Sequence, residues 1–229
     1  MSAAIFWKKR IRLIVTGVLS TFVVIAALVY AYALTGVQKI AIGKTFYFVL
    51  SDSEHVEAGA HFVSQNGGAG YVLERSASKY VVYAVYLEKA DAESVQAALQ
   101  TYGDEARIVG ERVDALYVKG NRSKAEEVCG TFSSFYGCIE VLNGEISRLS
   151  AGATQQSSKR ILATLRRQFA YLRARYEDRE EYAAFSDLCA SAEAALRESI
   201  EGTVLLKELR YLQCAWCDAY IRLAKTYTL

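Results

Sequence analysis

The sequence contains no proline among its 229 residues, although an average usage of about 5% would give roughly eleven. This absence excludes PxxP recognition segments, polyproline spacers and slow folding phases caused by native cis-prolines. It also favours long uninterrupted helices, because a proline in a helix interior breaks the helix.

An excess of charge of one sign is also lacking. Lysine and arginine number 27 and aspartate and glutamate 25, so the net charge is +2 and gives no bulk electrostatic case for binding nucleic acid. Hydrophobic residues make up 52% of the chain and charged residues 23%, which excludes a disordered, solvating polymer. The chain is therefore expected to fold.

One long apolar run is present at residues 13–34, which carry no charge. At 1.5 Å per residue the run spans about 33 Å, enough for a bilayer core of about 30 Å. The four basic residues before it predict a cytoplasmic N-terminus (residues 1–12) and an extracytoplasmic remainder. They are Lys8, Lys9, Arg10 and Arg12.

The sequence thus predicts a single-pass protein of the cell membrane with a transmembrane anchor at 13–34. A cleaved signal peptide is the alternative, because Ala31-Tyr32-Ala33 matches a small-x-small cleavage site. The length of the apolar run favours the retained anchor.

Residues 45–119 alternate strand patterns with amphipathic helix patterns. Strands are expected at 45–50, 70–74, 79–87 and 106–109, with a further short pattern at 115–118. Helices are expected after the capping-box pair Ser51 and Glu54, and after Asp91 as N-cap. The order β-α-β-β-α-β predicts an α+β domain in which the helices cover one face of an antiparallel sheet.

Two stretches carry a resemblance to a known family, FYFVLSDSEHVEAGAHFVSQNGGAGYVLE and YVVYAVYLEKADAESVQAALQTYGDEARIV. The segment resembles a SPOR domain, a peptidoglycan-binding module of bacterial envelope and division proteins. The resemblance implies a domain carried outside a membrane anchor, whose open sheet face binds glycan strands that lack stem peptides. Val49 and Ser51 stand where the family usually has glutamine and glycine. The third strand lacks the family's basic side chains and its Gly-Pro.

Strand alternation predicts which side chains lie on the open sheet face. The candidate glycan-binding residues are Tyr47, Val49, Ser51, Val81, Tyr83 and Val85. The opposite face, expected to lie against the domain's helices, carries Phe48, Leu50, Val82 and Ala84. Tyrosine rings can stack on sugars, but a face rich in valine and tyrosine is also typical of a surface covered by protein. Both interpretations remain open.

Residues 121–229 are expected to be helical throughout. A heptad seam runs from Ala125 to Leu149 in alternating steps of three and four, and Gly130, Gly137 and Gly144 recur on another stripe. The glycines suggest a groove for a closely approaching helix, with chance placement as the alternative. Apolar seams joined by short turns predict an antiparallel helical bundle. A tetratricopeptide-like array is the alternative, but no repeat of about 34 residues is visible.

The second helix of this region is basic on its outside. The predicted partner-docking residues are Lys159, Arg160, Arg166, Arg167 and Arg173, with Arg175 beside them. They suggest a docking strip for an acidic partner, such as the acidic SPOR-like segment itself. A solvated charged face is the simpler interpretation.

The sequence carries no recognisable catalytic motif. Cys214 and Cys217 form C-x-x-C within an expected helix, without a thioredoxin-like context. Buried thiols, structural disulfides and a redox or metal role remain open for the five cysteines. His55 and His61 lack the spacing of a ligand pair on one helix face. We expect no enzyme, no cofactor and no metal.

The leading hypothesis is therefore a membrane-anchored protein that binds peptidoglycan glycan, with a role in cell division or sporulation. The alternative is a non-catalytic envelope scaffold, whose apolar sheet face and heptad helices bind other proteins or further copies of the chain.

Overall fold

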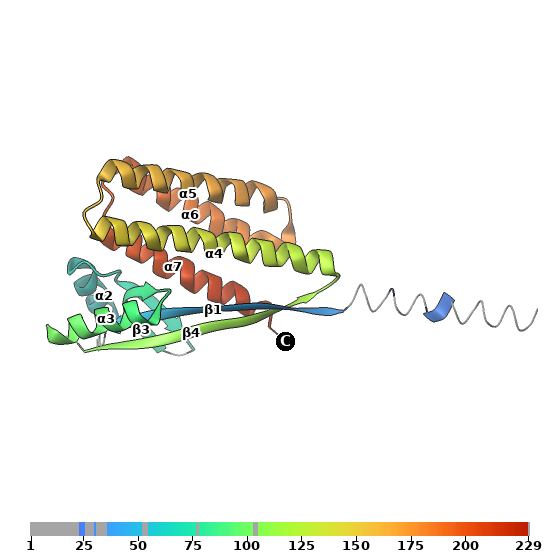
Figure 1. Cartoon of the computed structure of the whole chain (residues 1–229), viewed down its shortest axis with the longest axis horizontal. Coiled ribbons are helices and arrows are strands. Elements are labelled where there is room, and N and C mark those ends of the chain that lie inside the picture. The colour runs from blue at the N-terminus through green and yellow to red at the C-terminus, as the bar shows by residue number, and fades with distance from the viewer. Residues whose placement is uncertain are drawn as a thin grey trace, which may run out of the picture. The chain divides into compact units, whose positions relative to one another are not determined.

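A computed structural model describes residues 36–51, 55–76, 78–102 and 105–228, together with 23–25 and 30 (Figure 1). The first part of the fold contains β1 (Val37–Ser51), α2 (Val56–Gln65), β2 (Tyr71–Arg75), β3 (Ser78–Tyr86), α3 (Lys89–Thr101) and β4 (Ala106–Lys119). The second part contains α4 (Arg122–Ser150), α5 (Gln155–Tyr176), the short 3-10 helix η1 (Glu180–Tyr182), α6 (Ala183–Glu201) and α7 (Leu206–Lys225).

The sheet has four antiparallel strands in the order β2-β3-β1-β4. This confirms the predicted α+β class and the β-α-β-β-α-β order, a split β-α-β arrangement. The strands at 106–109 and 115–118 are one continuous strand. Gly110 falls between the two patterns, where an added Cβ would lie 3.4 Å from the ring of Tyr47. Glycine there admits a neighbouring side chain and does not end the strand.

Helices α2 and α3 begin close to the predicted positions, but with different caps. His55 is the N-cap of α2 and Glu88 that of α3, and neither side chain makes a capping hydrogen bond. The predicted cap Asp91 instead lies within the first turn of α3. Glu54 of the predicted capping box lies outside the described residues.

The helical region contains the helices expected from its apolar seams. Gly152, with φ at +91°, lies in the turn between α4 and α5. Thr154 caps α5 by accepting a hydrogen bond from the backbone N–H of Ser157. The charged stretch before α6 forms a turn and η1, so α5 and α6 are separate antiparallel helices (Figure 1).

Contacts divide the chain into two units. The first combines residues up to Ile40 with Tyr117–Cys129, and the second combines Ala41–Leu116 with Gly130–Leu229. In the first unit the amide of Gly120 donates a hydrogen bond to the carbonyl oxygen of Gly36. The second unit contains most of the sheet and most of the helices.

The predicted membrane topology is corrected by the structure. No helix among the described residues combines the length and the apolarity needed to cross a membrane. The transmembrane helix in the predicted fold class was therefore wrong, as was the single-pass localisation derived from it. Most of residues 13–34, and all of 1–12, lie outside the described residues. An uncharged run of sufficient length is necessary for a spanning helix, but it does not establish one.

Candidate functional site

The sheet face that carries Tyr47 and Tyr83 packs against helix α3. Val49 is fully buried in a cluster with Ala92 of α3 and Ala106 of β4, and both tyrosines pack against this cluster. The sequence predicted that this face would be open, so the assignment of the two faces was inverted. Alternation defines two faces of a strand, but it cannot tell which one the helices cover when both are apolar.

The six predicted glycan-binding residues do not share one face. Val85 pairs with Phe48, whereas Val49 pairs with Ala84, and the register shifts between Val49 and Leu50. Directly paired residues lie on the same face of a sheet, and neighbouring residues of a strand lie on opposite faces. Val85 and Val49 therefore lie on opposite faces of the sheet. The residues Val49, Val81 and Val85 are at most 1% exposed. Tyr47, Ser51 and Tyr83 are half-buried. The set therefore forms no exposed sugar-binding surface.

The other sheet face is covered by the chain's own helices. The ring of Phe46 lies 5.3 Å from that of Tyr220 on α7 and 6.1 Å from that of Tyr136 on α4, measured between centroids. Phe48 and Leu50 are buried as well. If the domain bound glycan as the family resemblance implies, the glycan would lie on this face, opposite to α2 and α3. In this structure α4 and α7 cover the face instead.

A buried charge cluster joins α7 to the sheet. Asp218 of α7 accepts a hydrogen bond of 2.8 Å from the hydroxyl of Tyr71 and lies 2.6 Å from Nη1 of Arg75. Nε of Arg75 also lies 2.5 Å from Glu111 of β4. Burial, together with the bond to Asp218, raises the pKa of Tyr71 well above its ordinary value. The cluster pairs its charges internally, so we interpret it as a structural link.

The predicted docking residues all lie on α5, which has six basic and no acidic side chains. Arg173 forms an ion pair of 2.9 Å with Glu193 of α6. In the described part of the chain, no ion pair involves the other four, which are Lys159, Arg160, Arg166 and Arg167. Tyr171 lies among these cations and is 66% exposed. Arg160 and Arg167 are exposed, Lys159 and Arg166 are half-buried, and no described ion pair joins any of the four to residues 45–119.

The thiols lie in environments that suppress their reactivity. All five cysteines are free, and all except Cys129 are buried. Burial raises the pKa of both Cys214 and Cys217, the C-x-x-C pair, well above the ordinary thiol value. A redox thiol requires the opposite shift together with access to solvent, so this geometry favours a packing role.

Metal-ligating side chains are dispersed. Within the described residues, no three His, Cys, Asp or Glu side chains are grouped so that they could hold a metal ion. His61 accepts or donates a hydrogen bond of 2.9 Å with Gln65 on the exposed side of α2.

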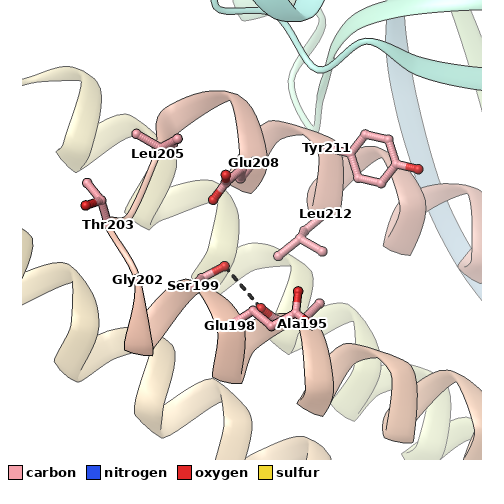
Figure 2. A pocket seen from close by; sticks show the side chains of 9 residues that line it. All are labelled: Ala195, Glu198, Ser199, Gly202, Thr203, Leu205, Glu208, Tyr211 and Leu212. Carbon is pink, nitrogen blue, oxygen red and sulfur yellow. Dashed lines mark hydrogen bonds between the residues drawn. The ribbon is translucent and has the colours of Figure 1, made fainter.

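A groove of about 530 Å³ lies between α6 and α7 (Figure 2). Its walls are partly apolar and carry two carboxylates. They include Ala195, Glu198, Leu205, Glu208, Tyr211 and Leu212. No ion pair among the described residues involves Glu198 or Glu208. The sequence does not reveal this groove, because it depends on how α6 and α7 pack against each other.

The chain matches no protein-family model, no curated protein and no solved structure. These comparisons therefore do not identify a SPOR domain.

Proposed function

We propose that this protein is a non-catalytic scaffold that binds acidic protein surfaces through the exposed face of α5. The observation that carries the proposal is the charge of α5, which has six cations and no anion over 22 residues. Five of those cations, all except Arg173, make no ion pair among the described residues. An exposed tyrosine flanked by arginines has the composition of interface hot spots.

The covered sheet supports the scaffold over glycan binding. Both sheet faces pack against helices of the same chain, as the contacts of Val49 with Ala92 and of Phe46 with Tyr220 demonstrate. A glycan strand would have to displace one of these layers, at the cost of exposing buried apolar area. A protein-binding function needs no such displacement.

The non-catalytic part of the proposal is supported by the state of the reactive groups. Activated nucleophiles need access and a favourable pKa. The buried thiols have raised pKa values instead, and the buried charges of Arg75 and Asp218 are engaged with each other.

Site-specific photo-crosslinking tests the docking surface. The full chain, carrying a benzophenone amino acid at position 171, is produced in its host and irradiated, and the adducts are identified by mass. We expect an adduct with a protein, either another copy or a different chain, that disappears in the double variant Arg160→Glu/Arg167→Glu. The control places the same probe at position 102, since Tyr102, the C-cap of α3, is 86% exposed and does not belong to α5. Equal yields at the two positions would contradict the proposal.

A pull-down on glycan strands without stem peptides tests the competing function. The full chain is expected to remain unbound. Specific retention of the wild-type chain would instead favour glycan binding.

A further inference from the structure

The charge on the outside of the α5–α6 pair is segregated by helix. α5 carries only cations, whereas α6 exposes Asp187, Glu198 and Glu201. The one cation of α6, Arg197, forms an ion pair with Glu193 of the same helix. Small residues lie between these charges, among them Ala163 and Ala170 on α5 and Ala194 on α6. Two opposite strips on adjacent antiparallel helices form a surface that is complementary to itself.

We propose that this surface binds a second copy of the chain across a twofold axis that runs parallel to α5 and α6. The inference rests on the proposed function of α5 and names its partner. Such an axis places α5 of one copy over α6 of the other. A rotation about it leaves unchanged the position of each residue along the axis direction, here called its height. The positive strip of each copy then meets the negative strip of the other, twice.

The heights of the charged residues fit this arrangement. Arg173 and Glu193 form an ion pair and therefore lie level on the antiparallel helices. Arg167 lies six residues before Arg173, and Glu198 lies five residues after Glu193. At a rise of 1.5 Å per residue, Arg167 and Glu198 differ in height by about 1.5 Å. The proposed axis thus brings Arg167 of each copy opposite Glu198 of the other.

The groove of Figure 2 provides a site for the exposed aromatic ring. Tyr171 lies two residues before Arg173, and Ala195 lies two residues after Glu193, so these two residues share a height. Ala195 lines the groove, which also contains Leu205 and Leu212. The ring of Tyr171, now 66% exposed, would be buried there in the second copy, which is the typical setting of an aromatic anchor.

The available area suits a dimer of moderate strength. α5 and α6 contain 22 and 19 residues, which correspond to lengths of about 33 and 29 Å. Two helices about 10 Å wide then offer roughly 600 Å² per copy, or about 1,200 Å² in total, at the lower end of stable interfaces. Because much of it is charged, we expect the association to weaken in high salt.

Sedimentation velocity of the full chain, with reversed charges, tests the proposal. The wild type is expected to form a dimer. Reversing α5 (Arg160→Glu/Arg167→Glu) or α6 (Glu198→Arg/Glu201→Arg) should each weaken self-association by about a hundredfold or more, since like charges would then face each other. Mixing the two variants should restore a heterodimer, because each has reversed the strip that the other retains. Circular dichroism verifies that both variants fold.

The matched control reverses two exposed cations elsewhere in the second unit, Lys89→Glu on α3 and Arg112→Glu on β4, and should leave the dimer intact. The proposal would be overturned if the wild type were monomeric, or if neither charge reversal weakened the dimer. It would also be overturned if the two variants did not associate on mixing, or if the wild type formed open assemblies larger than a dimer. The crosslinking experiment separates its failure from that of the scaffold. An adduct between position 171 and a different protein would support the scaffold function but contradict the dimer. The absence of any adduct would contradict both.

Discussion

The ring of Phe46 on β1 lies 5.3 Å from that of Tyr220 on α7, at an interplanar angle of 59°. Both side chains are almost fully buried. This contact closes the sheet face that a small α+β domain of this topology would otherwise leave open. It therefore connects the stability of the sheet to that of the helical bundle.

Replacing Phe46 with alanine should lower the free energy of unfolding by about 3–5 kcal/mol, because it leaves a cavity between the sheet and α7. Chemical denaturation of the full chain, monitored by circular dichroism, measures the change. The control Tyr102→Ala, at a position 86% exposed, should change it by less than about 0.5 kcal/mol. Similar effects of the two substitutions would show that α7 does not pack on this face in solution.

Removing the carboxylate of Asp218 should also destabilise the fold. Its side chain is 5% exposed and pairs with Arg75, whose guanidinium would then be left with Glu111 alone. We expect Asp218→Ala to cost about 3–5 kcal/mol. The triple variant Arg75→Met/Glu111→Gln/Asp218→Leu should cost less than Asp218→Ala, because it removes all three charges of the cluster and leaves none of them buried without a partner. Additive losses in a double-mutant cycle, measured by denaturation, would contradict this coupling.

The glycines at every seventh position of α4 should tolerate alanine. An added Cβ at Gly130, Gly137 or Gly144 would have no neighbour within 4 Å, so none of the described helices makes the close approach suggested by their spacing. Gly137→Ala should raise the free energy of unfolding by about 0.5–1 kcal/mol through helix propensity. As a contrast, Gly68→Ala should destabilise, since its Cβ would lie 2.5 Å from Cγ1 of Val63. A destabilising Gly137→Ala would indicate that α4 packs against something through this stripe.

Burial of the thiols predicts a loss of stability in alkali. Burial raises the pKa of Cys138 to about 11 and that of Cys189 to about 12, from an ordinary value of 9.0. Above pH 9 the unfolded chain loses thiol protons that the folded chain retains, so unfolding becomes more favourable as the pH rises toward 11. Each thiol contributes about 1.4 kcal/mol per pH unit across that window. Substituting Cys138 with alanine should reduce this slope in denaturation experiments.

Thiol labelling of the native chain provides an independent check. Cys129 is half-buried and should react first, while the four buried cysteines should react only after unfolding. Rapid labelling of Cys214 or Cys217 in the folded chain would reopen a redox role for the C-x-x-C pair.

Local patterns predicted most elements of the fold. The order of strands and helices between 45 and 119 follows from strand patterns of period two that alternate with amphipathic helix patterns. The heptad seam containing Phe132, Phe135 and Ile139 correctly predicted a buried helix face in α4. The ends of the elements were predicted less accurately. Gly110, for example, interrupts the strand pattern of β4 without ending the strand.

The candidate site was less predictable. The cationic strip of α5 is visible in sequence, because helix periodicity places Arg160 and Arg167 on one exposed side. The groove that would face this strip in the proposed dimer cannot be recognised from the sequence. Its walls combine Glu198 of α6 with Leu205 and Tyr211 near the start of α7. Such a combination depends on which helices become neighbours.

The sequence by itself determined what each segment could become: strands with two apolar faces, helices with narrow seams, and one helix of a single charge sign. These properties follow from the side chains within one or two turns, so they can be read locally. The tertiary structure alone decided that α3 covers Val49, that α7 covers Phe46 and that Asp218 meets Arg75. When both faces of a strand are apolar, either can be buried, and only packing against distant elements selects the partner of each.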